Sequence, residues 1–251
     1  MKTTLGILIL ITATSFAAHA QVLLSTGMSY QQDFNKLAAP PADHEAWADN
    51  ETLPGWYAAR ESGTNAPHFK SYRVGSGDIK KGWIYSFGSE QGKGRNPQSD
   101  RAFGSIATAS TGTIAFGVRF KNDTRNVIAN FTVSYSGEQW RNEGGAKAQT
   151  LIFSYRVSKT PMTDPQPGVL EGWSFLGAMD FKSSRDRSEE PKLDGNLPTS
   201  RLAKAGIVLP GVLLQPGEEL FLRWSDQNDN GPDDALAIDD FSLTWSPVRP
   251  R

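Results

Sequence analysis

Three segments near the middle of the chain alternate apolar residues with small or polar ones at every second position. They span residues 114–120, 131–135 and 151–157. Successive side chains of a β-strand point to opposite faces, so this pattern predicts strands with one face in a core. No run of ten or more residues shows the 3.6-residue period of an amphipathic helix. The chain is therefore expected to be all-β.

Weaker strand patterns, separated by turn signals rich in Gly, Pro, Asn and Asp, fill the rest of the chain. They lie at residues 30–37, 55–59, 69–74, 83–87, 101–106, 172–181, 202–209, 219–224 and 235–243. Many short strands with frequent turns are typical of a β-sandwich or jelly roll. Because we find no internal repeat and no dividing linker, we predict one antiparallel jelly-roll β-sandwich over residues 21–251.

The N-terminus has the features of a secretory signal peptide. Lys2 supplies the positive charge, residues 5–16 form a short apolar run, and Ala18-His19-Ala20 is a small-residue cleavage site. We therefore predict a signal peptide over residues 1–20 and cleavage after Ala20. No later stretch reaches the roughly 20 apolar residues that a membrane helix needs. The expected product is a bacterial protein without membrane insertion, secreted to the extracellular space or periplasm.

Composition excludes some function classes. The chain has no Cys, so a secreted fold of this length has to rest on its hydrophobic core. Loss of Lys2 leaves 25 basic against 27 acidic residues, and this near-balance argues against a nucleic-acid partner. His44 and His68 are the only histidines after residue 20. This scarcity disfavours a multi-histidine zinc site or a Ser-His-Asp triad.

The strand at residues 235–243 changes its apolar parity in the middle. Leu236 and Ile238 share one face, whereas Phe241 and Leu243 have the opposite parity. Such a switch implies a β-bulge or a change of facing sheet, and it falls on Asp239-Asp240. Two carboxylates at this point need a cation, backbone donors or open water.

Four consecutive residues favour sugar binding. Glu138, Gln139, Trp140 and Arg141 place an acid, an amide, an aromatic ring and a guanidinium side by side. An aromatic ring stacks on sugar C–H groups, while the planar polar groups bond vicinal hydroxyls. We predict these residues, with Arg223, as ligand-binding. Alternatively, Trp140 packs a sandwich edge and Glu138 pairs internally with an arginine.

The acidic loop before the last strand resembles the first half of a calcium loop. Asp226, Asn228, Asn230 and Gly231 stand at the matching alternate positions. The match then fails, because Ala237 occupies the position of the bidentate Glu. The loop can still bind calcium by using Asp233, Asp234 or Asp239. Alternatively, it is a solvated turn, since these residue types are common in turns.

Catalysis is a further alternative. Two carboxylates about 5 to 9 Å apart can hydrolyse a glycoside, and Glu138 with Asp226, Asp229 or Asp239 offers such a pair. If the chain is an enzyme, Glu138 and Asp226 are the candidate catalytic residues. Paired acids in a secreted β-protein also serve as structural groups or calcium ligands.

Several segments together resemble a group of bacterial secreted jelly-roll domains. These domains occur alone, in PEP-CTERM proteins, or beside extracellular nuclease and phosphatase domains, and they are similar to carbohydrate-binding modules. The segments that carry the resemblance are Gln32-Asp33-Phe34-Asn35, Gly55-Trp56-Tyr57, Asp100-Arg101-Ala102-Phe103-Gly104-Ser105, Gly137-Glu138-Gln139-Trp140-Arg141, Arg223-Trp224 and Ala237-Ile238-Asp239-Asp240-Phe241-Ser242-Leu243. The resemblance implies a jelly-roll fold and calcium between the first and last strands, with Asp33 and Asp239 as ligands.

We therefore expect a secreted, non-catalytic β-sandwich that binds a polysaccharide or surface glycan. The expected structural calcium ligands are Asp33, Asp226, Asn228, Asn230 and Asp239. One alternative is a glycoside hydrolase or polysaccharide lyase on the same scaffold. The other is an extracellular adhesion or matrix protein whose strands meet other proteins.

Overall fold

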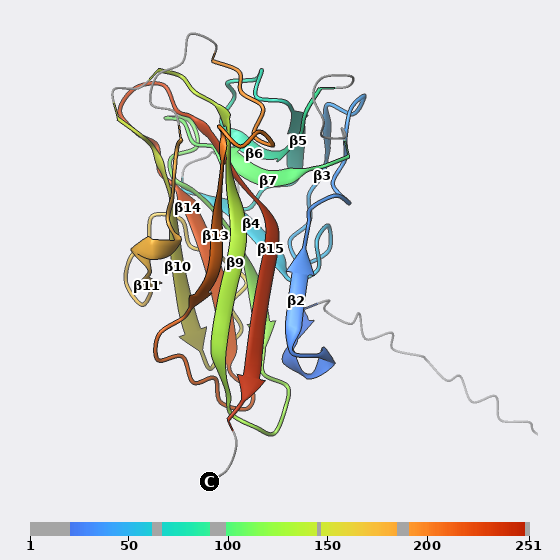
Figure 1. Cartoon of the computed structure of the whole chain (residues 1–251), viewed down its shortest axis with the longest axis vertical. Coiled ribbons are helices and arrows are strands. Elements are labelled where there is room, and N and C mark those ends of the chain that lie inside the picture. Colours follow the sequence, from blue (N-terminus) through green and yellow to red (C-terminus); the bar gives the residue numbers. More distant parts are fainter. Residues whose placement is uncertain (1–20, 62–66, 91–98, 145–146, 185–190, 249–251) are drawn as a thin grey trace, which may run out of the picture.

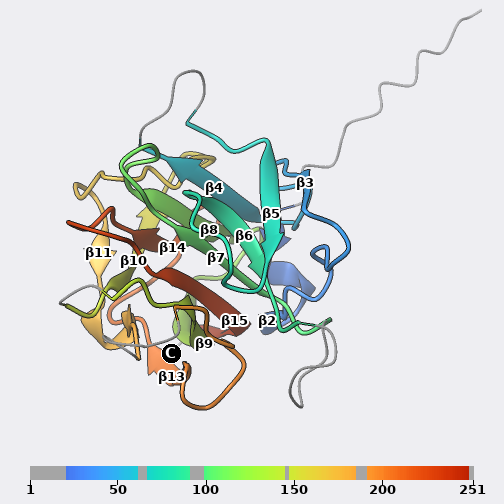
Figure 2. The ribbon, with the colours of Figure 1, turned by 90° about the horizontal axis from the view of Figure 1, so that it is seen from above.

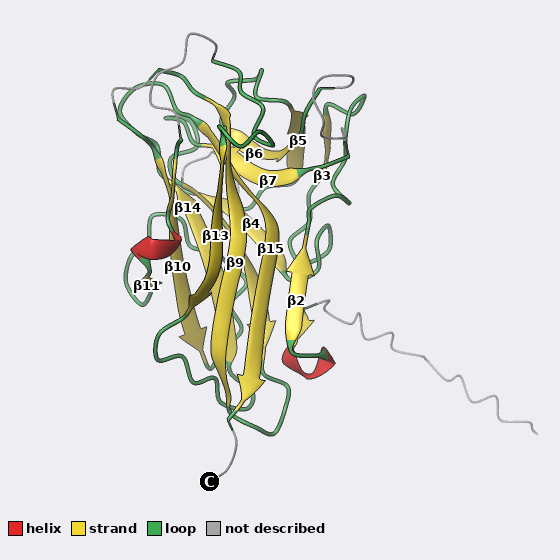
Figure 3. Cartoon of the chain, viewed as in Figure 1, coloured by secondary structure: helices red, strands yellow, loops and turns green. Residues whose placement is uncertain are grey.

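A computed structural model describes residues 21–61, 67–90, 99–144, 147–184 and 191–248; the predicted signal peptide lies outside these ranges. The described residues form strands, loops and two 3-10 helices, η1 (Leu24–Thr26) and η2 (Gly177–Met179), and they contain no α-helix (Figure 3). None of these helices has the length and hydropathy that a membrane span requires. The all-β prediction is confirmed.

The first sheet, called sheet A, has seven strands among the described residues. The order β1–β8–β14–β10–β11 forms its main path, with β4 beside β8 and β12 beside β10. The strands are β1 (Val22–Leu23), β4 (Trp56–Arg60), β8 (Ile114–Lys121), β10 (Thr150–Ser158), β11 (Ser174–Phe175), β12 (Phe181–Lys182) and β14 (Glu219–Asp226).

The second sheet, sheet B, has eight described strands in the order β13–β9–β15–β7–β6–β5–β3, with β2 beside β15. They are β2 (Ser29–Gln32), β3 (His44–Ala46), β5 (Ser71–Gly75), β6 (Trp83–Phe87), β7 (Ala102–Ile106), β9 (Ile128–Arg141), β13 (Arg201–Val208) and β15 (Ala235–Pro247). The pairs β1–β8 and β5–β6 are parallel, and all other pairs between these strands are antiparallel.

The two sheets stack face to face, as the predicted sandwich requires. Seen from above, β8 and β14 lie on one side, and β9 and β15 lie on the other (Figure 2). Apolar side chains of alternate positions meet between them, including Phe103, Phe116 and Phe241. At the centre, the rings of Trp56 and Trp224 stack with their centroids 5.9 Å apart. This core lies between the sheets and joins both layers.

The parity switch in the last strand is a β-bulge, as predicted. Asp239 pairs with Ser136 of β9, but the next pair joins Ser242 to Ser134, so β15 holds one extra residue. Asp240 has a φ of 49°, a left-handed conformation that Asp tolerates better than most residues. The bulge lets Ile238 and Phe241 both face the core. It also marks the point where β15 changes partner from β7 to β2.

Two predicted strands are interrupted. The segment 172–181 is split into β11 and β12 by η2, whose Met179 carbonyl accepts a hydrogen bond from the Tyr135 hydroxyl. The segment 30–37 ends as a strand at Gln32, because Phe34 has a φ of 54° and turns its ring into the core. In both cases a contact with another strand overrides a local apolar pattern.

Loops cover the outer face of each sheet and bury further apolar side chains there. On sheet B, Tyr85, Phe87 and Trp140 belong to a second apolar cluster. On sheet A, Tyr57 and Phe221 pack with Trp173, which lies in the segment between β10 and β11. Polar side chains next to these outer clusters are therefore covered and do not reach solvent.

Candidate functional site

The loop between β14 and β15 lies at the end of the sandwich opposite to the C-terminus (Figure 1). Its first anchor is Asp226, whose side chain turns inward between the sheets. Asp226 Oδ2 accepts hydrogen bonds from Ser105 Oγ at 2.7 Å and from the Ala107 N–H at 3.0 Å. Burial raises the pKa of Asp226 to about 7. Asp226 therefore fixes the loop to β7 and is not a surface ligand.

The far end of the loop is held by two amides. The Gln149 side chain donates to the Pro232 carbonyl at 2.9 Å and accepts the Asp234 N–H at 2.6 Å. Asp234 in turn accepts the Gln139 amide at 3.0 Å and the Glu143 N–H at 3.0 Å. Gln139 is fully buried, so it positions the loop from beneath. It is not the exposed sugar ligand that the sequence predicts.

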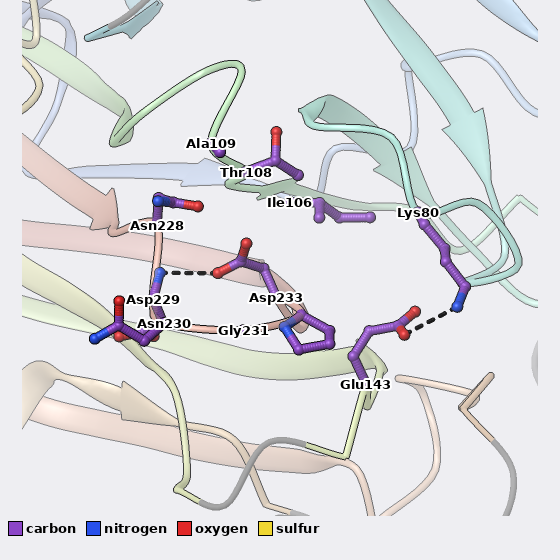
Figure 4. A pocket seen from close by; sticks show the side chains of 11 residues that line it. Lys80, Ile106, Thr108, Ala109, Glu143, Asn228, Asp229, Asn230, Gly231 and Asp233 are labelled. Carbon is purple, nitrogen blue, oxygen red and sulfur yellow. Dashed lines mark hydrogen bonds and ion pairs between the residues drawn. The ribbon is translucent and has the colours of Figure 1, made fainter.

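Between these anchors the loop shapes a pocket of about 560 Å³ (Figure 4). Ile106, Ala109 and Pro232 form apolar parts of its wall. Polar groups form the rest, namely those of Lys80, Thr108, Glu143, Asn228, Asp229, Asn230 and Asp233. Hydroxyl, amide, carboxylate and ammonium groups thus face one space, so the pocket can donate and accept several hydrogen bonds.

Asp233 is the buried acid of this pocket. Its Oδ1 accepts the Asp229 N–H at 2.9 Å, and its other oxygen points into the pocket toward the side of Asn228 and Thr108 (Figure 4). Burial, with smaller contributions from the carboxylates of Asp229 and Asp234, raises the pKa of Asp233 to about 6. At neutral pH the pocket therefore holds a carboxylate whose charge is poorly solvated.

Glu143 is the paired acid on the opposite side. Lys80 Nζ lies 3.1 Å from Glu143 Oε2, and the Arg141 guanidinium contacts Oε1. Arg141 also donates to the Gly77 carbonyl at 2.8 Å. Arg141 is 5% exposed, so it supports Glu143 and does not meet a ligand directly. This is a correction of its predicted role.

Trp140 offers no ring face to a sugar, contrary to the sequence-based prediction. It is fully buried, with its ring stacked on Phe87 at 5.9 Å between centroids. Gly195 packs so closely that a Cβ there would lie 2.4 Å from the indole. The indole N–H donates to Glu138 Oε2 at 3.1 Å. The alternative interpretation, that Trp140 packs the sandwich, fits these contacts.

Glu138 and Asp239 form a second acidic group, here called the acid pair, on the outer face of sheet B. Both carboxylates are almost fully buried. Arg201 Nη1 lies 3.3 Å from Glu138 Oε1, and Arg201 Nη2 lies 3.9 Å from Asp239 Oδ2. Burial raises the pKa of Glu138 to about 8 and that of Asp239 to about 9, and the Glu138 carboxylate adds to the upward shift of the Asp239 pKa. Burial therefore favours the neutral, protonated form of both carboxyls.

The predicted catalytic pair does not come together. Glu138 lies on the outer face of sheet B, whereas Asp226 bonds Ser105 between the sheets, so sheet B separates them. Glu138 is also closed to solvent. The glycosidase geometry of two facing carboxylates is therefore not formed by these two residues.

Arg223 lies on a different sheet from the segment with which it was grouped. It projects from the outer face of sheet A, where its guanidinium stacks over Trp173 at 3.7 Å from the ring centroid. It donates to Ser154 Oγ at 2.9 Å and to the carbonyls of Gln166 and Val169 at 2.9 Å and 3.0 Å. Arg223 thus holds the segment between β10 and β11 in place and is not a glycan ligand.

The five predicted calcium ligands do not converge. Asp33 is exposed beside the Asn35 N–H, Asp226 is between the sheets, and Asp239 is on the outer face of sheet B. Only Asn228 and Asn230 share the pocket. Across the described ranges, no group of three or more His, Asp or Glu side chains is arranged to hold a metal ion.

Sequence reasoning missed Lys80, Thr108 and Glu143, which complete the pocket. Each comes from a different loop, and the pocket wall spans residues 80–233 of the chain. No local pattern marks them, because their proximity depends on how the start of β6 and the ends of β7 and β9 lie at the same end of sheet B. Asp233 and the two asparagines are the part of the site that the loop composition did reveal.

Comparisons with known proteins place the chain near no established family. No family model matches it, and no curated protein does. Similar solved structures include the carbohydrate-binding module TmCBM61 in complex with β-1,4-galactotriose, at 9% identity and a TM-score of 0.34, covering 81% of this chain and 99% of that one. The K2 cleaved adhesin domain of Lys-gingipain is 11% identical, with a TM-score of 0.39 and coverage of 86% and 99%.

A third similar structure is the enzymatically active domain of bacteriophage CBA120 tailspike protein 4, at 8% identity and a TM-score of 0.35. It matches 77% of this chain, and this chain spans about a fifth (19%) of its length. Similarity at this level carries no information about a ligand. The resemblance of the Gly137–Arg141 and Ile238–Phe241 motifs to PEP-CTERM proteins stays a prediction.

Proposed function

We propose that this protein binds a glycan of a polysaccharide or cell surface in the pocket beside the β14–β15 loop. The observation that supports the proposal is the pocket itself, where fixed polar groups surround an apolar wall. Sugars present hydroxyls on their edges and C–H groups on their faces, so such a lining matches both. Asn228, Asp229 and Asn230 are exposed at the pocket and supply amide and carboxylate oxygens.

The proposed binding site is the pocket beside the β14–β15 loop, and not the segment 138–141 that the sequence predicts. The glycan partner is kept, while Glu138, Gln139, Trp140, Arg141 and Arg223 become supporting residues. No catalytic step is assigned to the pocket. Glu143 is paired with the cationic groups of Lys80 and Arg141, and the predicted catalytic pair of Glu138 and Asp226 is not formed. Binding without turnover is the function that these contacts favour.

The test is native affinity electrophoresis of the purified protein against a panel of polysaccharides. We expect one or more polymers to retard the protein, and Asn228→Ala to remove most of the retardation. Asp33→Ala is the matched control, because Asp33 is an exposed acid that does not line the pocket. No retardation by any polymer, or equal loss in the control, would overturn the proposal. Degradation of a polymer in the gel would instead indicate an enzyme.

Calcium stabilisation is part of the proposal that the same experiment tests. Asp229 and Asp233 are the carboxylates of the predicted calcium loop that line the pocket. A second gel run with chelator separates the two cases. Loss of retardation in chelator supports a calcium requirement, whereas unchanged retardation removes calcium from the account.

We also propose that the chain is secreted, as the sequence of residues 1–20 predicts. Expression in a bacterium with an outer membrane, followed by fractionation and mass spectrometry, tests this. Recovery outside the cytoplasm with Gln21 at the N-terminus is the expected result. A cytoplasmic protein that retains Met1 would contradict it.

An adhesion or matrix function is the second candidate, and one observation favours it. The edge strand β13 pairs with β9 on one side, and no described strand pairs with its other edge. Leu202 and Val208 of this strand are about half exposed. An open edge with apolar side chains can pair with another chain. Concentration-dependent self-association that Val208→Lys abolishes, without any glycan, would favour this function.

A further inference from the structure

The charges of the pocket beside the β14–β15 loop are unbalanced. Three carboxylates line it, from Glu143, Asp229 and Asp233, against the single ammonium of Lys80. Lys80 and Arg141 both contact Glu143, so that acid is compensated. Among the ion pairs of the described residues, none involves Asp229 or Asp233. The uncompensated charge therefore lies on one side of the pocket.

Asp233 is the focus of this charge. It is 7% exposed, and one of its oxygens is directed into the pocket (Figure 4). Its Oδ1 accepts the Asp229 N–H, and the nearby carboxylates of Asp229 and Asp234 add to the burial that raises its pKa. Further acids lie behind it, because Asp226 and Asp234 anchor the same loop. A ligand with a positive group at this position would form a charge-assisted hydrogen bond in a partly desolvated site.

The remaining lining suits a sugar ring. Asn228 and Thr108 stand near the oxygen of Asp233 that faces the pocket, where they can bond neighbouring hydroxyls (Figure 4). Ile106 and Pro232 provide apolar surface for the C–H face. A ligand that combines an ammonium with vicinal hydroxyls would use both features at once. A uronate or sulfated sugar would meet the same carboxylates with repulsion.

We propose that the pocket selects amino sugars with a free ammonium group, as in de-N-acetylated polysaccharides, over N-acetylated, neutral or acidic sugars. This inference rests on the proposed function, since it names the ligand class of the same site. Asp233 and Asp229 would bind the ammonium. Asn228 would orient the ring through its hydroxyls.

The test compares a cationic, a neutral and an anionic sugar oligomer. Isothermal titration calorimetry measures binding of a β-1,4-glucosamine oligomer, its N-acetylated counterpart, and an oligogalacturonate of equal length, near pH 6. We expect the glucosamine oligomer to bind about tenfold or more tighter than the acetylated one, the size of a charge-assisted hydrogen bond. Oligogalacturonate is expected to show no binding. Equal affinity for the two β-1,4 oligomers would overturn the selection.

Variants separate the site from general attraction to an acidic protein. Asp233→Asn and Asp229→Asn should each reduce glucosamine binding about tenfold and leave acetylated binding nearly unchanged. Asp229 is exposed, so its variant keeps the test valid if Asp233→Asn fails to fold. Asp33→Asn serves as the control and should bind as the natural chain does. An oligolysine of matched charge that binds as tightly as the glucosamine oligomer would contradict a sugar site.

The outcomes also separate this inference from the proposed function. If neutral or acetylated oligomers bind as tightly as the glucosamine oligomer and Asn228→Ala removes this binding, the pocket binds glycans and the amine selection is wrong. If no oligosaccharide binds, both proposals fall together. Selective glucosamine binding that depends on Asp233 supports both.

Discussion

The acid pair on β9 and β15 and the pocket acids of the loop before β15 are carboxylates in two different settings. Glu138 and Asp239 lie on the outer face of sheet B, under loops that exclude solvent, and share the guanidinium of Arg201. Asp229 and Asp233 lie on the loop before β15 and face an open pocket without a basic partner. Cover by loops, and not the residue type itself, therefore decides which of these acids can meet a ligand.

The largest expected effect tests the claim that the Glu138–Arg141 segment is interior. Trp140→Ala should lower the free energy of unfolding by about 3 to 5 kcal/mol, the cost of emptying a large buried aromatic site. Denaturant unfolding measures this. Phe175→Ala is the control, because Phe175 is 48% exposed, and it should cost well under 1 kcal/mol. A Trp140→Ala protein of natural stability that no longer binds glycan would restore the stacking role.

The acid pair predicts a stability that depends on pH. The folded carboxyls have pKa values of about 8 and 9, above the usual value of about 4 in the unfolded chain. The folded state therefore binds more protons, so its stability is full below pH 4 and is lost as pH rises toward 9. We expect the free energy of unfolding to fall between pH 5 and pH 8, by up to about 1.4 kcal/mol per pH unit for each of the two carboxyls.

Neutral variants of the pair should flatten this dependence. Glu138→Gln with Asp239→Asn is expected to remove most of the slope, when measured by denaturant unfolding at each pH. Asp233→Asn is the comparison variant from the pocket. Because the folded pKa of Asp233 is about 6, this residue changes the free energy of unfolding with pH only between about pH 4 and pH 6. An unchanged slope above pH 6 in the double variant would mean that the acid pair is not buried as described.

Variants of the pocket residues should weaken glycan binding and leave stability nearly unchanged. Asn228→Ala and Asp229→Ala are expected to reduce glycan binding about fivefold to tenfold, because each removes a hydrogen bond at the pocket. Both residues are exposed, so the stability change should stay within about 0.5 kcal/mol. Titration calorimetry and thermal unfolding of the same samples measure both quantities. Destabilisation of several kcal/mol by either variant would erase the distinction between the two acidic regions.

The strands were the predictable part of this molecule. Segments with strict alternation, such as 114–120 and 131–135, became β8 and part of β9, because one face of each meets the core. The parity switch at Asp239-Asp240 correctly indicated a bulge. Both signals are local, because the alternation of apolar and polar residues along a strand shows which of its faces is buried.

The site was only partly predictable, because its burial depends on distant segments. Glu138 and Trp140 read as a surface group, yet their outer face of sheet B is covered by residues such as Gly77 and Leu193. Neighbouring residues of a strand also point to opposite faces, so Gln139 faces inward while Glu138 does not. The acidic loop was recognised from its composition, but its partners Lys80 and Glu143 come from other loops.

Hydrogen–deuterium exchange with and without a saturating glycan oligomer is the sharpest test of whether the glycan binds beside the β14–β15 loop, because it reports which backbone segment the ligand protects. We expect slower exchange in residues 227–233 and 106–109, with little change in residues 137–141, which are already buried. Protection confined to residues 137–141, with the loop unchanged, would contradict it.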